Sequence, residues 1–164
     1  MDQTTTSPQA QNAAAWQLRL LHGPDAQFCA LIAQLDELMN SLYPPEANQL
    51  IAPEALFQSH IRVQGLYFGP RLAGCVAVLM HQDYAEIKRF VVDREFRGCG
   101  AGKRLLREAL ALSRQAGKTL VRLESGRLQP AANRLYRAFG FEPCGPFGAY
   151  PDHPDSVFMQ LRCG

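Results

Sequence analysis

The chain has 164 residues, 47% of them hydrophobic and 20% charged, and its formal net charge is +2. This length suits one domain with a sizeable core. The small net charge gives no electrostatic reason to expect a nucleic-acid partner. Charges, glycines or prolines interrupt every apolar run before it reaches membrane-spanning length. We therefore expect a soluble globular protein with neither a nucleic acid nor a membrane as its partner.

The cysteines are odd in number, are scattered along the chain and form no Cys-x-x-Cys pair. Such a set favours free thiols in a reducing compartment over a disulfide or zinc framework. The four histidines also lie far apart, without the spacing of metal ligands. The N-terminus lacks the order of a secretion signal. We expect a cytoplasmic protein without a metal site.

The hydrophobic pattern divides the chain into a tail and one domain. Residues 1–15 are mostly Thr, Gln, Ser and Ala, which predicts a disordered N-terminal tail. The domain then covers residues 16–164 and begins with a strand over 16–20. A helix starts after Gly23-Pro24-Asp25 and ends at Leu42, because its apolar residues follow i, i+3, i+4 spacing. A short helix is expected over 53–59.

Antiparallel strands come next, and a strand–helix–strand unit follows them. The Gly69-Pro70-Arg71 turn predicts a hairpin between two strands. The full set of expected elements is strands over 61–68, 72–80, 84–92, 119–124, 141–146 and 156–162, with helices over 100–115 and 130–139. This order predicts an α/β (α+β) fold with a central mixed, mostly antiparallel sheet and helices beside it.

The most informative segment is the glycine-rich turn over residues 97–102, between a strand and a helix. Unpaired backbone N–H groups and the positive end of the helix make such a turn an anion site. A P-loop is excluded, because Arg97 replaces its first glycine and Arg104 its hydroxyl residue. A dinucleotide fingerprint is disfavoured, because the spacing is Gly-x-Gly-x-Gly and antiparallel strands come first.

Two motifs together resemble the GNAT N-acetyltransferase superfamily. Arg97, Gly100 and Gly102 match its coenzyme-A-binding turn, and the segment over 133–141 is similar to its Asn-x-x-x-Tyr-x-x-x-Gly-Phe pattern. The resemblance covers residues 16–162 and implies about seven strands, with helices on both faces and two splayed parallel strands at the CoA site. A narrower resemblance, in residues 42–46, 145–150 and 156–159, is to small bacterial YsnE-like members.

The resemblance implies acetyl-CoA as co-substrate. Its pyrophosphate would be held by backbone N–H groups over 98–103, and backbone N–H groups on the preceding strand would polarise the thioester. Asn133 would lie against the pantetheine. The implied cofactor-binding residues are Phe90, Val91, Val92, Arg97, Gly98, Cys99, Gly100, Ala101, Gly102, Lys103 and Asn133.

Direct acetyl transfer needs a base for the amine and a proton donor for the departing thiolate. By resemblance, Glu86 is the candidate base, and its structural alternative is a salt bridge to Lys88 or Arg71. Tyr136 matches the family's general acid, and its alternative is a core tyrosine.

The acceptor is expected to be a small-molecule amine or a protein amino group, and a homodimer is left open. Tyr43, Glu46, Tyr150 and Asp152 are the polar candidates for its site. The alternative function is a non-catalytic acyl-CoA-binding or sensing module of the same fold. Glu86 and Tyr136 together argue against that alternative, because a sensor needs neither.

Overall fold

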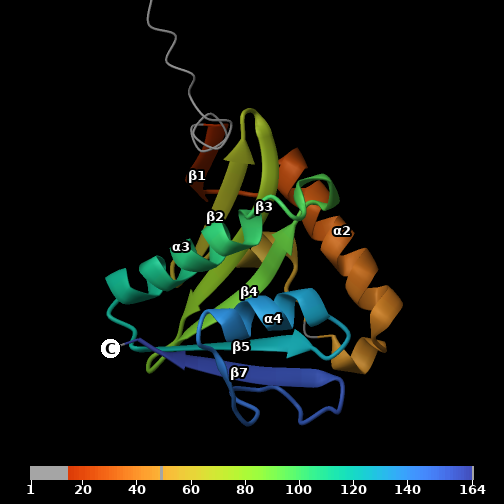
Figure 1. Ribbon diagram of the computed structural model, residues 1–164, viewed down its shortest axis with the longest axis vertical. Coiled ribbons are helices and arrows are strands. Elements are labelled where there is room, and N and C mark those ends of the chain that lie inside the picture. Colours follow the sequence, from red (N-terminus) through yellow and green to blue (C-terminus); the bar gives the residue numbers. More distant parts are fainter. Residues whose placement is uncertain (1–14, 49, 164) are drawn as a thin grey trace, which may run out of the picture.

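Seven strands form one mixed sheet in the order β1-β2-β3-β4-β5-β7-β6 (Figure 1). The computed structural model describes residues 15–48 and 50–163. The strands are β1 (Trp16–Leu21), β2 (Ile61–Phe68), β3 (Arg71–Met80), β4 (Ala85–Val92), β5 (Leu120–Gly126), β6 (Glu142–Pro143) and β7 (Ser156–Arg162). The β4–β5 pair is parallel, and the other five pairings are antiparallel. The expected mixed, mostly antiparallel sheet is confirmed.

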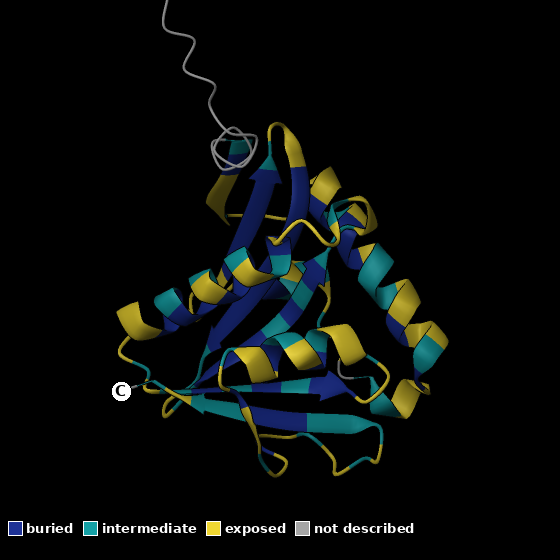
Figure 2. Cartoon of the chain, viewed as in Figure 1, coloured by how far each residue is buried: buried dark blue, intermediate teal, exposed yellow. Residues whose placement is uncertain are grey.

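Helices cover both faces of the sheet (Figures 1 and 2). The α-helices are α2 (Ala26–Leu42), α3 (Ala101–Gln115) and α4 (Pro130–Ala138), and the 3-10 turns are η1 (Pro45–Ala47), η2 (Pro53–Leu56) and η3 (Arg94–Phe96). One buried cluster joins the sheet to α3 and α4, and a second joins it to α2. None of the helices over 15–48 and 50–163 is long and apolar enough to cross a membrane.

Several expected boundaries need correction. The helix expected over 53–59 is the 3-10 turn η2, which ends at Leu56. The strand expected over 141–146 shrinks to Glu142–Pro143, because Pro143 has no N–H and Gly145-Pro146 follows. Strand β5 runs two residues past Glu124, because Ser125 and Gly126 pair with β7. The tail expected over 1–15 lies, except for Ala15, outside the described residues.

A β-bulge interrupts β4. Cys75 pairs with Val91 and Ala77 with Lys88, so Arg89 and Phe90 together oppose Val76. Arg89 adopts a positive φ of 51°. The bulge changes the alternation: Ile87 packs in the α3 cluster, whereas Val91, four residues later, packs in the α2 cluster. An unbroken strand would place both side chains on one face.

Beyond the bulge, β4 and β5 separate. Their parallel pairing covers only Ala85–Ile87 and Val121–Leu123. Because β5 continues to Gly126 and β4 to Val92, the carboxyl-terminal halves of the two strands diverge. The expected pair of splayed parallel strands is thereby confirmed. Ligands of sheets with parallel strands collect at such carboxyl ends.

The buried Arg89 side chain ties α2 to the bulge. Its Nη1 donates to Asp36 Oδ1 on α2 at 2.5 Å, and its Nε and Nη2 donate to the Ile51 carbonyl at 3.1 and 2.6 Å. A second hydrogen bond, from Gln34 Nε2 to Asp93 Oδ2 at 2.9 Å, joins α2 to the end of β4. These contacts hold α2 at a fixed place beside the diverging strands.

We predict that Arg89→Met destabilises the fold, because Asp36 and the Ile51 carbonyl lose a buried charged donor. The free energy of unfolding from urea titration should fall by about 3 kcal/mol. The matched control is Arg71→Met, which breaks the exposed Arg71–Glu95 pair and should cost less than about 1 kcal/mol. Equal losses in the two variants would contradict an anchoring role for Arg89.

Candidate active site

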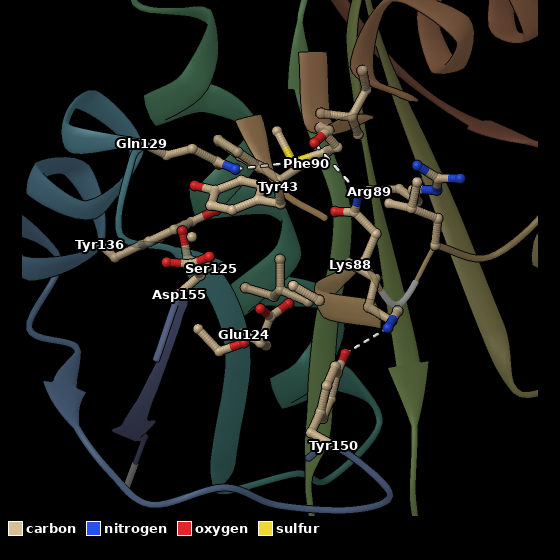
Figure 3. Close-up of a pocket in the computed structure, with 18 residues that line it drawn as sticks. Tyr43, Lys88, Arg89, Phe90, Glu124, Ser125, Gln129, Tyr136, Tyr150 and Asp155 are labelled. Atoms are coloured by element: carbon tan, nitrogen blue, oxygen red, sulfur yellow. Dashed lines mark hydrogen bonds between the residues drawn. The ribbon is translucent and has the colours of Figure 1, made fainter. Parts of the chain in front are cut away.

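A pocket lies between α2 and the diverging halves of β4 and β5 (Figure 3). Side chains from α2, β4, β5, α4 and the loop before β7 line it. The lining residues include Leu35, Met39, Tyr43, Leu50, Lys88, Arg89, Phe90, Glu124, Ser125, Gln129, Tyr136, Tyr150 and Asp155. In Figure 3, Glu124 lies between Ser125 on one side and Lys88 with Tyr150 on the other. The pocket therefore extends from the gap between the diverging halves of β4 and β5, called the splay below, to a polar cluster of Glu124, Lys88 and Tyr150.

The glycine-rich turn forms the start of α3, as the sequence predicts. Gly98 and Gly100 have positive φ angles of 80° and 82°, a conformation that favours glycine. Gly100 is the N-cap of α3, and no side chain caps the helix. The first backbone N–H groups of α3 have no partner within the helix. Residues 97–100 and Lys103 are exposed, while Ala101 is buried.

Gly102 brings this turn close to the splay. A Cβ at this position would lie 3.2 Å from Leu135 Cδ2 of α4 and 3.6 Å from the Phe90 ring. Phe90 lines the pocket and contacts the Tyr136 ring, with centroids 5.8 Å apart. Val91 and Val92 return to the β3–β4 ladder opposite Cys75 and Gly74 and do not line the pocket. Phe90 is thus the β4 residue that links the turn to the pocket.

Two buried polar atoms at the splay have no hydrogen-bond partner among the described residues: Ser125 Oγ and Asn133 Oδ1. The amide of Asn133 is held in place, because its Nδ2 donates to the Gly126 carbonyl at 3.0 Å. Buried polar atoms are costly unless they are paired. A ligand with amide groups running between β4 and β5 would supply such partners, and the pantetheine arm of CoA is a ligand of this kind.

Tyr136 projects from α4 into the same pocket. It is buried, and its ring packs against Phe90 and Phe141. Burial, and secondly the nearby Glu124 carboxyl, raise the pKa of Tyr136. At neutral pH its hydroxyl therefore keeps its proton and is available as a hydrogen-bond donor.

Glu124 is the pocket carboxylate that the sequence interpretation missed. Burial is the largest cause that raises its pKa to about 7, although a hydrogen bond with Ser156 and the charge of Lys88 act in the opposite direction. A carboxyl group with this pKa exchanges protons near neutrality. The available signal was an acidic residue at the carboxyl end of the strand before α4.

The Glu86 carboxylate is buried and surrounded by partners. Glu86 Oε2 accepts from the Tyr150 hydroxyl at 2.5 Å, and Oε1 lies 2.9 Å from His81 Nε2. Lys88 Nζ is 3.7 Å from Oε2, so the structural alternative of a salt bridge to Lys88 is present. Arg71 pairs instead with Glu95 at 2.7 Å. Tyr150 and Lys88 line the pocket, whereas Glu86 lies behind them.

The four polar residues expected around the acceptor separate into two groups. Tyr43 and Tyr150 line the pocket, and the Tyr43 hydroxyl accepts from the backbone N–H of Leu128 at 3.0 Å. Glu46 and Asp152 are exposed and lie outside the pocket lining. Within the described ranges, no three His, Cys, Asp or Glu side chains are grouped to hold a metal ion.

Comparisons with known proteins agree with this geometry. The model of the acetyltransferase (GNAT) family matches residues 30–141. The IAA acetyltransferase of Azospirillum brasilense is 36% identical over 132 residues, covering 79% of this chain and 86% of that protein. The uncharacterized N-acetyltransferase YsnE of Bacillus subtilis is 29% identical, with 83% and 92% covered.

Solved structures share the fold. A Klebsiella pneumoniae protein, provisionally described as an acyl-CoA N-acyltransferase, superposes with a TM-score of 0.77 at 29% identity, covering 92% of this chain and 99% of that one. The PaiA N-acetyltransferase of Thermoplasma acidophilum, solved with coenzyme A, has a TM-score of 0.70 at 19% identity, with 90% and 98% covered. The family match, the splayed strands and the glycine-rich helix start agree, and the chain belongs to the GNAT family of acetyltransferases.

Proposed function

We propose that this protein is an acetyl-CoA-dependent N-acetyltransferase that moves the acetyl group directly to an amine. The carrying observation is that one pocket contains both the splay between β4 and β5 and a carboxyl group suited to accept a proton. The family membership supports acetyl transfer, and the choice of an amine acceptor is part of the proposal.

Acetyl-CoA would lie across the glycine-rich turn and into the splay. The backbone N–H groups over 98–103 would hold its pyrophosphate, and Arg97 and Lys103 would add positive charge. Ser125 Oγ and Asn133 Oδ1, which have no hydrogen-bond partner among the described residues, would pair with the pantetheine amides. Backbone N–H groups of the β4 segment over 90–92 would polarise the thioester carbonyl. The co-substrate supplies the activated acetyl group. Two proteins of the same fold were solved with CoA, which supports CoA as the ligand.

Two carboxyl groups are candidates for the base. Glu86 remains the prediction from the sequence, and the structure adds Glu124. The geometry favours Glu124, because it lines the pocket while the Tyr150 hydroxyl and Lys88 separate Glu86 from it. In this proposal Glu124 removes the proton of the attacking amine, and Glu86 positions Tyr150 and Lys88.

Tyr136 is the proposed proton donor for the departing thiolate. As the amine nitrogen bonds to the carbonyl carbon, the carbon–sulfur bond breaks and its electron pair stays on sulfur. The Tyr136 hydroxyl hydrogen-bonds to the sulfur and passes its proton to it, while the amine proton taken up by Glu124 returns to Tyr136, which leaves CoA as a thiol and the acceptor as an amide. The raised pKa of Tyr136 keeps its hydroxyl protonated at neutral pH, so the donor is present when the thiolate forms.

The proposal predicts tight acetyl-CoA binding and turnover that depends on Tyr136. We expect thiol release with a panel of primary amines, and Tyr136→Phe should lower kcat by about 100-fold, because one proton donor is lost. The dissociation constant for CoA, from calorimetry, should change little. Tight CoA binding without turnover of any amine would favour the sensing module. Absence of CoA binding would contradict the proposal entirely.

The base assignment predicts a pH profile. The Glu124 carboxyl must be ionised to accept a proton, so kcat/KM should rise with pH through about 7. Glu124→Gln should remove this inflection and lower kcat/KM by about 100-fold or more. Glu142→Gln, at an exposed site on β6, is the matched control. If Glu86→Gln abolishes the inflection and Glu124→Gln retains it, Glu86 is the base.

The raised pKa of Glu124 also predicts that the stability of the fold decreases as pH rises, whereas kcat/KM increases. Because the folded state holds the Glu124 proton more tightly than an unfolded chain, the stabilisation is present below about 4.5 and is lost as pH rises through about 7. Glu124→Gln should therefore raise the melting temperature of the protein at pH 8 and change it little at pH 5. Equal shifts at both pH values would contradict the raised pKa.

A further inference from the structure

A mostly buried lysine, Lys88, lies at the side of the pocket opposite Ser125. Only 13% of the Lys88 side chain is exposed, and its Nζ donates to the Tyr150 hydroxyl at 2.5 Å. Tyr150 in turn donates to Glu86, whose other oxygen contacts His81. The Glu86 carboxylate therefore makes its shortest contacts with Tyr150 and His81, at 2.5 and 2.9 Å, and is 3.7 Å from Lys88. This network holds the Lys88 ammonium in one position on the pocket wall.

The other charged groups of the pocket, like Lys88, have protein partners or a shifted pKa. Arg89 turns toward Asp36 and the Ile51 carbonyl. Asp155 pairs with Arg127 Nε at 2.6 Å. The pKa of Glu124, about 7, leaves this carboxyl protonated for part of the time at neutral pH. An anion on the acceptor would therefore meet the Lys88 ammonium in addition to the contacts that Lys88 makes with Tyr150 and Glu86.

The α2 side of the pocket is apolar. Leu35 and Met39 of α2 line it, and Leu50, whose exposed fraction is 38%, adds apolar surface from the loop that follows. Apolar side chains in such a place favour a ligand with an apolar group. The pocket thus offers a proton acceptor, a cation and an apolar wall to one small molecule.

From this arrangement we propose that the acceptor is a free amino acid with an apolar side chain. The inference rests on the proposed function. The amine faces Glu124 and the thioester, the carboxylate is held by Lys88 beside Tyr150, and the side chain lies against Leu35, Met39 and Leu50. A carboxylate near a desolvated ammonium forms a charge-assisted hydrogen bond, which is stronger than a neutral one.

This proposal also gives a role to Glu86 and its hydrogen-bonded neighbours. The pKa of Lys88 is lowered, and burial is the largest cause, while Glu86 and Glu124 act to raise it. Glu86 therefore keeps the ammonium charged in a desolvated place, and its hydrogen bond from Tyr150 fixes the hydroxyl beside that ammonium. In this role Glu86 is a positioning residue for acceptor binding.

The test uses three acceptors that differ only at the carboxylate: leucine, leucinamide and 3-methylbutylamine. For the native chain, kcat/KM should be about 10- to 100-fold higher for leucine, because a hydrogen bond to a charged group is lost with the other two. Putrescine, which carries a second cation, should be the poorest acceptor. Acetyl-CoA-dependent thiol release measures all four.

Lys88→Met should abolish the preference for leucine. We expect the KM for leucine to rise by about 10-fold or more, while the KM for 3-methylbutylamine, which has no carboxylate for Lys88 to hold, rises much less. Comparing the two acceptors within one variant cancels any change in kcat that follows from the effect of the Lys88 charge on Glu124. Lys88→Arg should retain part of the preference, because it keeps the charge. Lys118→Met, which removes a half-buried lysine that lies outside the pocket lining and contacts the Gln82 carbonyl, is the matched control. CoA binding by each variant checks that its fold is intact.

The outcomes separate the two proposals. If CoA binds and amines turn over, but leucine is no better than 3-methylbutylamine, the amino-acid inference is overturned and the proposed function stands. If no amine turns over, the proposed function itself fails. If Lys88→Met does not fold, the comparison of the three acceptors with the native chain still decides the inference.

Discussion

The bulge at Arg89–Phe90 is the constraint on which the site depends. Two residues oppose Val76, so β4 bends away from β5 after three paired positions. That divergence opens the pocket between the two strands. The bulge also turns Arg89 toward α2 and Phe90 toward α3 and α4. One irregularity in the ladder thus opens the pocket and determines which side chains line it.

Burial determines the chemistry of the charged residues around this cleft. Desolvation raises the pKa of Glu124 to about 7 and raises that of Tyr136, while it lowers the pKa of Lys88. The same environment therefore makes a carboxyl group exchangeable near neutrality and keeps a phenol protonated. Arg89 avoids this cost, because Asp36 and the Ile51 carbonyl satisfy its guanidinium. Each of these buried charged groups therefore has either a hydrogen-bonded partner or a shifted pKa.

Much of the frame could be predicted from the sequence, because local rules govern it. Glycine at 98 and 100 permits the left-handed turn before α3, and Gly69-Pro70 closes the β2–β3 hairpin. The alternating and i, i+3, i+4 patterns locate the sheet and its three helices. The proposed acceptor side of the pocket was harder to predict, because its residues come from α2, two strands and the loop before β7. Residues such as Leu35 and Tyr150 become neighbours of one pocket only in the folded chain.

The sequence by itself determined the glycine-rich turn on the proposed donor side, since alternate glycines before a helix start are a local feature. Only the tertiary structure decided which carboxyl group meets the pocket. Glu86 and Glu124 both lie on strands that flank the splay, and no local pattern distinguishes them. Their difference arises from long-range contacts: Tyr150 and Lys88 cover Glu86, while the divergence of β4 leaves Glu124 on the pocket wall. Burial and partner contacts are properties of the folded chain, so sequence spacing cannot report them.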